Sequence, residues 1–492
     1  MSMRNYTRFL ALSATAALMC VAATAQSARP TAFTNARIHT VSGDIIEKGT
    51  LVIRNGKIEA VSKDAVVPAG AKVVDATGKT IMPGLVSAWS RAGLNAPSSR
   101  GNTPTRSGRR GRMMRFPSGG SGSSAKMSAA TKVIDRVYIR QPIFGKLLEV
   151  GVTSLALNPS GGGFPGLGAV LNPDGKTREA LTRDDEAFVQ IGMQRNSAAK
   201  KMLGDAFTKA KKVVEEREKP PAPPAKKPEP TKKPEAGKPA PKPAPKPAEG
   251  KEPPKPTPKP TPKPTPTPKP TPKPKPKEGD KKQEPKPAAK PAPTKKAPKK
   301  RKDPNLEVLA DLLQGKRRAI VQIGSAADLL HWRTAVKDDI KFPRMVAVTR
   351  HDSTSGTLDL VIDHLKKWEC SVLLPPTLST KPRTAYLTHP AKDLHDAGIE
   401  IGFILGERPT TVRGIFFNLM ELVRAGLPAD VAIKAITQVP AKALGIDKRT
   451  GTLEVGKDAD LLIFEGDPLS PTGKLEQVWL RGSHVVKDGA DN

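Results

Sequence analysis

The sequence is poor in cysteine and in long apolar runs. Only Cys20 and Cys370 occur among the 492 residues, and Cys20 lies in an N-terminal segment that we expect to be removed. Lipidation of Cys20 is disfavoured because the bulky Met19 stands where a lipoprotein signal needs a small residue. A single remaining thiol excludes an intramolecular disulfide, so stability has to come from packing. Past residue 25 no apolar run approaches the roughly 20 residues of a membrane span, so we expect no transmembrane segment after signal removal.

The first 25 residues have the three-part pattern of a cleavable export signal. Arg4 and Arg8 precede the apolar run "FLALSATAALMCVAATA", which ends in small residues at positions 23–25. We therefore predict a mature chain that starts near Gln26 and is exported to the periplasm or the extracellular side of a bacterial envelope. The alternative is an uncleaved membrane anchor, for which this apolar run is short.

Positive charge and proline are concentrated in one segment, residues 219–302. It contains 30 of the 51 prolines and contributes +19 to the net charge of +34. Stretches such as "KPTPKPTPKPTPTPKPTPKPKPK" have no apolar periodicity, so the segment cannot form a core and we predict that it is disordered. Proline and the mutual repulsion of lysines favour an extended polyproline II chain, which predicts a semi-rigid cationic spacer.

The composition of this insertion limits its partners. It has no aromatic side chains on which bases stack, so we expect no nucleic acid binding by an exported chain. Its lysines favour weak, salt-sensitive contact with anionic envelope polymers or lipid head groups. A solvated insertion without a dedicated partner is the alternative.

Both ends of the chain show the pattern of short antiparallel strands. Residues 26–80 and 448–492 alternate apolar and polar residues between turn sequences such as Asn-Gly and Ser-Gly. We predict that these two segments are the halves of one small β-sandwich.

Between these ends, strand-length apolar runs alternate with helical patterns. The sequence predicts an α/β fold with a (β/α)8 TIM-like barrel, whose halves are residues 81–218 and 303–447 on either side of the insertion. The third and fourth strands are the least regular part of this pattern. The eight expected strands are residues 80–88, 151–157, 167–172, 187–193, 318–324, 344–349, 370–376 and 399–406. Helices are expected at residues 198–218, 305–318, 326–339, 356–369, 415–426 and 428–445.

Two glycine-rich stretches are interpreted as loops. Residues 95–128 are dominated by Gly, Ser and Arg and predict a flexible loop directly after the first barrel strand. Residues 161–168, "GGGFPGLG", invite comparison with a phosphate-binding loop, but neither Gly-Lys-Ser nor Gly-Lys-Thr follows them. We interpret them as a pliable loop beneath the barrel mouth.

Three stretches resemble the amidohydrolase superfamily, near its imidazolonepropionase-like branch. They are "NARIHTVSGDIIEKGTLVIRNGKIEAVS", "VVDATGKTIMPGLVSA" and "ITQVPAKALGIDKRTGTLEVGKDADLLIFEGDPLS". The resemblance implies a barrel together with a sandwich, and it makes the Gly-Lys-Asp-Ala-Asp stretch at residues 456–460 a structural turn. It also implies one or two divalent metals at the C-terminal mouth of the barrel, which activate water for attack on a carbon-nitrogen bond.

The positions at which this resemblance implies metal ligands hold other residues here. A His-x-His pair is implied after the first strand, where the chain has Trp89, Ser90 and Arg91. The fifth strand has Gln322 in place of a histidine. Tryptophan and arginine offer no lone pair to a cation, and Arg91 would repel one. We therefore expect no metal cofactor.

A few titratable residues remain near the expected mouth. His351, with Asp352 beside it, is close to the implied sixth-strand ligand, and Glu407 follows Gly406 where the resemblance implies a catalytic aspartate. His389 is a further candidate for the mouth. These residues keep open the alternative of a hydrolase for non-peptide carbon-nitrogen bonds in cyclic amides or dipeptide-like substrates. Such an enzyme would use one divalent metal, such as zinc, or metal-free acid-base catalysis.

The sequence therefore favours a non-catalytic or strongly altered barrel that acts as a binding or scaffold protein in the cell envelope. Trp89 and Arg91 either bind an anionic or planar ligand by stacking and charge, or fill the space that absent metals would leave. His331, His364 and His395 fall within helical patterns and are expected to be structural.

Overall fold

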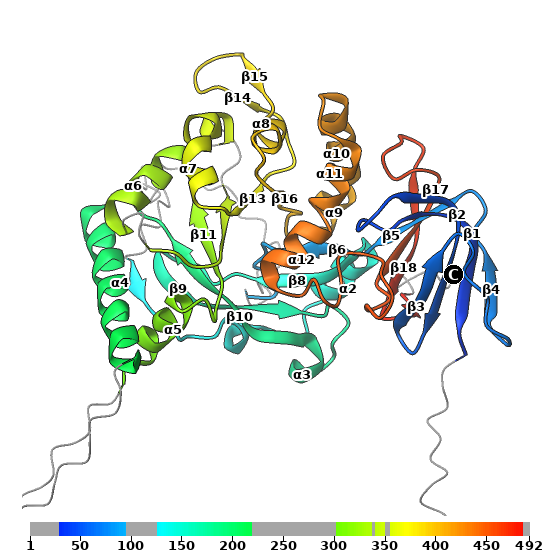
Figure 1. The fold of residues 1–492 in the computed structure, drawn as a ribbon, viewed down its shortest axis with the longest axis horizontal. Coiled ribbons are helices and arrows are strands. Elements are labelled where there is room, and N and C mark those ends of the chain that lie inside the picture. Colours follow the sequence, from blue (N-terminus) through cyan, green and yellow to red (C-terminus); the bar gives the residue numbers. More distant parts are fainter. Residues whose placement is uncertain (1–28, 95–124, 219–301, 337–339, 350–354, 486–492) are drawn as a thin grey trace, which may run out of the picture. The chain divides into compact units, whose positions relative to one another are not determined.

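The protein is described here by a computed structural model, which covers residues 29–94, 125–218, 302–336, 340–349 and 355–485. The expected signal of residues 1–25, most of the expected loop of residues 95–128, and the insertion up to residue 301 lie outside these ranges. Figure 1 shows that the described part has a mixed α/β fold. It contains two large sheets and one two-stranded sheet.

Strands from both ends of the chain form one eight-stranded sheet, in the order β19-β18-β17-β5-β1-β2-β3 with β4 beside β1. Its strands are β1 (Thr31–His39), β2 (Ile45–Arg54), β3 (Lys57–Ser62), β4 (Lys72–Asp75), β5 (Lys79–Pro83), β17 (Leu461–Glu465), β18 (Lys474–Leu480) and β19 (Ser483–His484). Antiparallel pairing of β5 with β17 joins the two halves, with Ile81 opposite Ile463. The two ends of the chain thus build one β-domain as a single hydrogen-bonded sheet, rather than as two separate sheets.

Along one edge, strand β1 pairs with two different strands, because a bulge interrupts its regular hydrogen bonding. Residues 31–34 pair with β4, and residues 37–38 pair with β5. Asn35 lies between them with a φ of 60°, a left-handed conformation that asparagine tolerates better than most residues. The interruption lets one strand hold both neighbours. The sheet buries a core of its own that includes Phe33, Leu51, Leu461 and Trp479.

The second sheet has nine strands, in the order β16-β13-β12-β11-β10-β9-β8-β6 with the short β7 beside β9. They are β6 (Leu85–Ser87), β7 (Lys126–Met127), β8 (Val152–Leu157), β9 (Gly163–Leu171), β10 (Thr182–Gly192), β11 (Ala319–Ile323), β12 (Arg344–Val348), β13 (Ser371–Leu374) and β16 (Ile401–Phe403). Each apolar run expected to be a barrel strand contributes one of them. The first run is shared between β5 in the β-domain and β6 in the barrel sheet.

Strand β9 departs from the expected (β/α)8 pattern. It pairs antiparallel with both β8 and β10, and no helix lies between β8 and β9. The connection from Leu157 to Gly163 is far shorter than the dozen or more residues that a parallel crossover needs, so the chain has to turn back. The expectation of a parallel third strand is therefore wrong. The interpretation of residues 161–168 as a loop is also wrong from Gly163 onwards, because β9 starts there and is fully buried.

The two edge strands of the barrel sheet meet at one connecting segment. The N–H of Phe403 in β16 donates to the carbonyl of Ala435 (2.8 Å), and the N–H of Val86 in β6 donates to the carbonyl of Ile436 (3.0 Å). Both acceptors belong to the turn between helices α11 and α12. This turn takes the place that a closing strand would have, and it brings the two edges of the sheet together as in a barrel.

Helices cover the outer side of the barrel strands. They are α2 (Ile143–Glu149), α3 (Arg178–Leu181), α4 (Ser197–Glu218), α5 (Pro304–Leu313), α6 (Ala326–Val336), α7 (Ile362–Lys367), α8 (Pro390–Asp396), α9 (Pro409–Arg413), α10 (Ile415–Arg424), α11 (Ala429–Lys434) and α12 (Gln438–Leu444), with 3₁₀ segments η1 (Val133–Arg136) and η2 (Ser355–Val361). A small hairpin, β14 (Ser379–Thr380) and β15 (Leu387–Thr388), precedes α8. Among the described residues, no helix combines the length and apolar character needed to span a membrane.

The helix expected at residues 428–445 is divided into α11 and α12. Pro440 lacks an N–H donor and is tolerated in the first turn of a helix but not in its interior, so a new helix has to begin shortly before it. Thr437 marks the break, with a φ of −129°. This break frees the carbonyls of Ala435 and Ile436 for the edge strands of the barrel.

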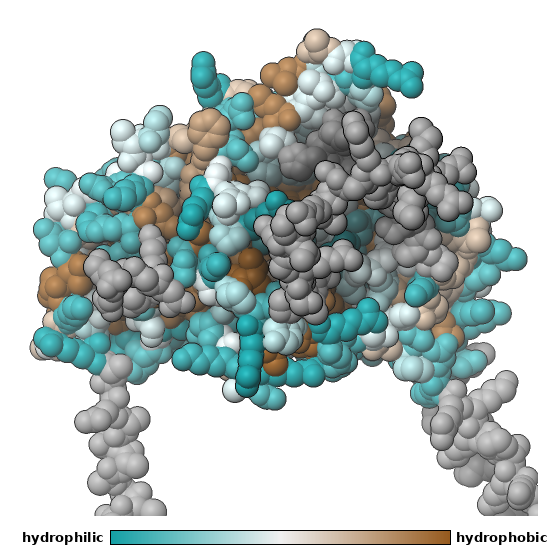
Figure 2. All heavy atoms as spheres, turned by 180° about the vertical axis from the view of Figure 1, so that it is seen from behind, coloured by the Kyte–Doolittle hydropathy of each residue, from teal (hydrophilic) through white to brown (hydrophobic). Residues whose placement is uncertain are grey.

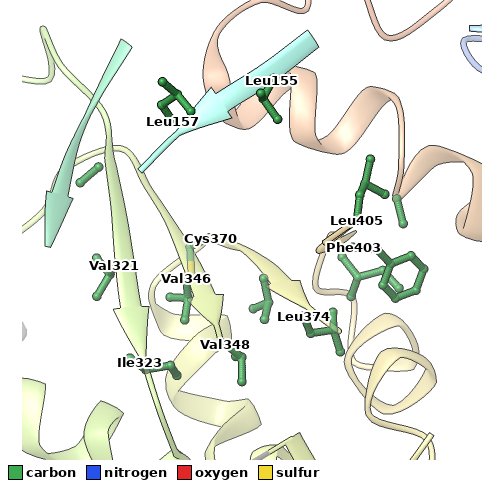
Figure 3. Packing of buried hydrophobic residues seen from close by; sticks show 14 of the residues in the cluster. Leu155, Leu157, Val321, Ile323, Val346, Val348, Cys370, Leu374, Phe403 and Leu405 are labelled. Atoms are coloured by element: carbon green, nitrogen blue, oxygen red, sulfur yellow. The ribbon is translucent and has the colours of Figure 1, made fainter. Parts of the chain in front are cut away.

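Alternate residues of the barrel strands face opposite sides of the sheet. Leu155, Val321 and Val346 belong to a buried cluster that includes residues of the surrounding helices (Figure 3). The intervening positions, such as Ala156 and Ile320, form a second buried cluster inside the barrel. This alternation decides which side chains at the ends of the strands turn toward the barrel mouth.

A buried ion cluster fixes the β-domain to the barrel. Nη2 of Arg183 in β10 lies 3.5 Å from Asp458 Oδ2 and 3.8 Å from Asp460 Oδ2, and the Arg183 side chain is 2% exposed. Two further nitrogens of Arg183 donate to Ser154 and Asn172. Both carboxylates belong to the Gly-Lys-Asp-Ala-Asp stretch, which therefore has a structural role at the junction of the two sheets.

Burial dominates the electrostatics of this cluster. Desolvation raises the pKa of Asp460 and lowers the pKa of Arg183, and the attraction between the two opposes both shifts. Asp460 also accepts hydrogen bonds from Thr450 Oγ1 and from the N–H of Arg481, both at 3.0 Å. Because Asp460 is out of water, removal of Arg183 leaves its carboxylate buried without its nearest cation.

Replacing Arg183 by Met should lower the free energy of unfolding by about 3–5 kcal/mol, because Asp460 would lose its buried cation. Adding Asp460→Asn to that variant should recover part of the loss, which a double-mutant cycle by urea denaturation would measure. Arg140→Met, at an exposed arginine, is the control and should change stability by less than about 0.5 kcal/mol. Equal losses for the Arg183→Met and Arg140→Met chains would contradict this account.

The residues on either side of the insertion are connected by ion pairs. Arg217, at the end of α4, pairs with Glu307 and Asp311 of α5. Asp303 caps α5 by accepting the N–H of Asn305 (2.9 Å). Helices α4 and α5 are thus joined by ion pairs between their own side chains.

Deletion of residues 219–302, with a short Gly-Ser linker in their place, should leave the midpoint of thermal unfolding unchanged. The reason is that α4 and α5 keep their mutual contacts. Differential scanning calorimetry of both chains would measure this. Loss of a cooperative transition in the shortened chain would instead show that the insertion packs on the barrel.

Candidate ligand site at the barrel mouth

Strand β6 begins at a close approach to β8. The N–H of Gly84 donates to the carbonyl of Asp460 (2.9 Å). A Cβ at this position would lie 2.2 Å from Oγ1 of Thr153, so only glycine fits. This contact explains the Pro-Gly-Leu sequence at the start of β6. Five residues after Gly84 the chain reaches the barrel mouth at Trp89.

Trp89 packs inside the barrel. Its side chain belongs to the interior cluster with Val86, Ala156, Phe188 and Met345, and the residue is 6% exposed. An indole brings a large apolar surface, and burial at this depth leaves little of it for a ligand to stack on. The burial therefore supports the interpretation of Trp89 as a filler of the barrel interior.

Neutral polar side chains lie at the mouth ends of the neighbouring strands. They are Asn158 after β8, Gln190 in β10, Gln322 in β11 and Thr349 after β12, and we call them the polar layer. Nδ2 of Asn158 donates to Oε1 of Gln190 (3.2 Å), and Nε2 of Gln322 donates to Oγ1 of Thr349 (2.9 Å). Gln322 and Thr349 thus stand on the fifth and sixth strands, where the resemblance implies ligands, and they are hydrogen-bonded to each other.

Sequence reasoning does not identify Asn158 and Gln190 as part of the mouth. Both are fully buried, and Asn158 also accepts the N–H of Ser90 (3.0 Å), which fixes the segment after β6. Nε2 of Gln190 is buried without a hydrogen-bond partner among the described residues. The available signal is a single glutamine between Val189 and Ile191 inside an apolar strand, which marks an inward polar position.

A cavity of about 780 Å³ opens at the C-terminal ends of these strands. Gln322 and Thr349 line it together with Arg91 and the segments 160–162 and 192–195. This end of the strands is where TIM-like barrels hold their ligand sites. Nε of Arg91 is buried and has no hydrogen-bond partner among the described residues. The cavity therefore has a guanidinium with unused hydrogen-bonding capacity in its wall.

The other charged groups in the cavity wall are engaged with each other. Nε of Arg195 donates to Oδ1 of Asp328 (2.7 Å), and the N–H of Gly324 donates to Oδ2 of the same carboxylate (2.8 Å). Asp328 lies in the first turn of α6, where a carboxylate is stabilised by the helix N-terminus. Asp328 is thus a structural residue. Arg91, by contrast, forms no ion pair with any residue that the structure describes.

Glu407 lies next to Arg91 and contacts its backbone. Oε1 of Glu407 accepts the N–H of Arg91 (3.0 Å), while the glutamate itself is exposed. The preceding Gly406 has a φ of 88°, a left-handed conformation in which glycine is unstrained. Glu407 therefore reaches the mouth from the end of β16 and fixes the backbone of the residue that brings positive charge to the cavity.

The histidine candidates do not gather at this cavity in the described structure. His351 and Asp352 lie outside the described residues. Nδ1 of His389 accepts the N–H of Lys392 (3.0 Å), and its Nε2 is 2.9 Å from the carbonyl oxygen of Leu422. His389 lines a different cavity, beside α8, so the structure does not bring it to the mouth. The three histidines expected in helices lie in α6, α7 and α8: His331, His364 and His395.

The described residues at the mouth do not fit a divalent metal. Within the described ranges no three His, Cys, Asp or Glu residues are grouped as metal ligands. The side chains that replace the implied ligands are an indole, a guanidinium and an amide, whereas zinc is bound by imidazole, thiolate and carboxylate. Cys370 does not supply a thiolate, because burial raises its pKa to about 12.

Comparison with known proteins agrees with the fold. The sequence model of the Amidohydrolase family matches residues 385–489. The chain is 29% identical over 106 residues to Amidohydrolase tasK of Hapsidospora irregularis, which covers 21% of this chain and 11% of that protein. It is 26% identical over 129 residues to an imidazolonepropionase of Klebsiella pneumoniae (strain 342), which covers 25% of this chain and 32% of that protein. The matches thus span about a tenth and about a third of these curated relatives.

A solved structure shares the fold over nearly the whole chain. The amidohydrolase from Thermotoga maritima MSB8 superposes with a TM-score of 0.63 at 20% identity, covering 93% of this chain and 100% of that chain. The sequence matches support the amidohydrolase superfamily, and the solved structure shows that the fold is shared, with a TIM-like barrel. The matched residues 385–489 include Glu407 and His389 but exclude Trp89, Arg91 and the polar layer.

Replacing Trp89 by Ala should lower the free energy of unfolding by about 3–5 kcal/mol, because it would leave a large void inside the barrel. Trp89→Phe should cost less, since a phenyl ring keeps part of the packing. Urea denaturation followed by circular dichroism would measure both. A loss below about 1 kcal/mol for Trp89→Ala would mean that the indole is not part of the core.

Proposed function

We propose that this chain is a binding protein on an amidohydrolase fold, which takes up an anionic ligand at the barrel mouth and does not hydrolyse it with a metal. The single observation that carries the proposal is the burial of Trp89 in the interior cluster. Its position corresponds to the first histidine of the His-x-His pair that the resemblance implies. With an indole packed at that position, a cation would lose one of its ligands and the space it needs.

Arg91 supports an anionic ligand. Guanidinium groups recognise carboxylates and phosphates through paired hydrogen bonds, and Nε of Arg91 has no partner among the described residues. Glycines 161, 162, 192 and 324 also line the cavity. At Gly162 and Gly192 the missing side chain makes room for Gln194 and for the backbone of Gly161. The amide of Gln322 and the hydroxyl of Thr349 would orient the rest of a polar ligand.

The proposal includes export to the cell envelope. It is supported by the charged, apolar and small-residue regions of residues 1–25 and by the lysine- and proline-rich composition of residues 219–302. In that compartment the insertion would make weak contacts with anionic polymers or lipid head groups, and the barrel would act as a binding or scaffold domain. We propose no nucleic acid partner.

A hydrolase that acts on non-peptide carbon-nitrogen bonds is the second candidate. It is supported by membership of the superfamily and by the location of Glu407 beside Arg91, where a carboxylate has access to the cavity mouth. His351 and Asp352 would have to complete such a site. A single zinc ion held by these residues, or acid-base catalysis without metal, would be its chemistry.

Two measurements on the full chain separate these functions. Isothermal titration calorimetry with benzoate, succinate and inorganic phosphate should detect binding of at least one anion, and Arg91→Gln should weaken that binding about 10- to 100-fold by removing a charged hydrogen bond. Arg140→Gln, at an exposed arginine outside the cavity, is the matched control and should bind like the wild type.

The companion measurement is elemental analysis with a hydrolysis panel of cyclic amides and dipeptides. The proposal predicts no stoichiometric zinc, iron or manganese and no turnover. Stoichiometric metal together with turnover that a chelator abolishes would contradict the binding function and support the hydrolase. If the wild-type and Arg91→Gln chains bound the anion with equal affinity, Arg91 would not be part of the ligand site.

A further inference from the structure

A second cavity, of about 700 Å³, lies between the β-domain and the helices of the barrel. One wall is the end of β1 with the β1–β2 turn, and the others are α10, α11 and the loop that follows β17. On the molecular face drawn in Figure 2, hydrophobic residues reach the surface as separate patches among hydrophilic ones. The cavity, by contrast, brings together apolar side chains from three parts of the chain.

The body of this cavity is apolar. Val41, Val423, Ile433 and Leu469 contribute to its lining, and all four belong to the large buried cluster of the molecule or pack against it. Cavities of several hundred Å³ with mostly apolar walls and a few polar groups are typical of small-molecule sites. The walls come from residues far apart in the sequence, so the cavity exists only in the folded chain.

One end of the cavity holds a polar group without a partner. His39 lines the cavity, and its Nε2 is buried with no hydrogen-bond partner among the described residues. The neighbouring Arg37 forms ion pairs with Asp467 (2.5 Å) and Glu47 (3.4 Å), and its Nε is likewise buried without a hydrogen-bond partner among the described residues. A buried polar atom without a partner costs free energy, and a ligand that supplied the missing hydrogen bond would remove that cost.

The charges around His39 favour a neutral ligand. Arg37, Asp467, Lys434, Asp430 and Asp44 line the cavity, with Glu47 next to Arg37. Lys434 pairs with Asp430 (2.9 Å), and Arg37 pairs with its two carboxylates. A ligand anion would meet the excess of carboxylates, and a ligand cation would meet Arg37 close to the imidazole. Desolvation and Arg37 lower the pKa of His39, so its ring is neutral at neutral pH and Nε2 is available as a donor or as an acceptor.

The backbone at this end of the cavity is strained. Val41 has a φ of 69°, a left-handed conformation that is unfavourable for a β-branched residue. Such strain persists only where surrounding structure enforces it, and it gathers at ligand sites and switches. Here residues 41–45 line the same cavity as residues of α11. The strain thus belongs to the same few residues as the unpartnered imidazole.

We propose that this cavity binds a small neutral amphipathic molecule, with an aliphatic or aromatic body against Val41, Val423, Ile433 and Leu469 and one hydroxyl or amide head at His39. This site is separate from the barrel mouth and does not depend on the function proposed for it. Its ligand differs in class from the anion expected there. The chain would therefore hold two ligands of different chemistry.

The test uses the full chain and four six-carbon probes: 1-hexanol, hexanamide, hexylamine and hexanoate. Hexanol and hexanamide should raise the midpoint of thermal unfolding and give saturable binding in ligand-observed NMR, whereas hexylamine and hexanoate should bind at least several-fold more weakly. Ala429 lines the cavity but is itself exposed at the start of α11, so Ala429→Trp should fill the entrance without disturbing the core. Ala198→Trp, at an exposed alanine of α4, is the matched control.

Ala429→Trp should abolish binding of the neutral probes, and Ala198→Trp should leave it unchanged. His39→Phe should keep the ring volume and lower the affinity for hexanamide about two- to tenfold through loss of one hydrogen bond. Equal binding by the Ala429→Trp and Ala198→Trp chains, equal binding of all four probes, or no binding of any would each overturn the proposal. Because Ala429 is exposed, the comparison stands even if the His39 variant does not fold.

Discussion

The buried ion cluster around Arg183 sets the geometry on which the barrel mouth depends. Asp460 faces Arg183 with its carboxylate, and its backbone carbonyl accepts the N–H of Gly84 directly before β6. The same residue of the β-domain thus compensates a charge in the barrel and fixes the start of its first strand. With β6 anchored there and packed against Thr153, the register of the chain carries Trp89 into the interior.

Packing inside the barrel closes the space below the mouth. A barrel interior has to be filled to the density of a solid, because voids cost free energy. Here the indole of Trp89 supplies volume, and the polar layer forms one amide–amide and one amide–hydroxyl hydrogen bond. What remains open is the cavity above, with Arg91 in its wall.

Much of this arrangement could be predicted from the sequence because a buried strand is a local apolar run. Such runs located the barrel strands, and the positions of Trp89, Arg91 and Gln322 at strand ends followed from them together with the resemblance. The reversal of β9 could be read only from the short spacing between two apolar runs, and Gln190 only from one polar residue within a strand. His389 could not be placed, because its capping of α8 and its contact with Leu422 depend on tertiary structure. His351 and Asp352 stay predictions.

The central claim is that an indole, and not a cation, occupies the barrel mouth next to Arg91. X-ray diffraction at the zinc absorption edge, from crystals grown with excess zinc chloride, tests this claim most directly. The account predicts electron density for Trp89 inside the barrel and no anomalous peak at the strand ends. An anomalous peak there, coordinated by Glu407 with His351 or Asp352 and with the indole turned out of the interior, would contradict it.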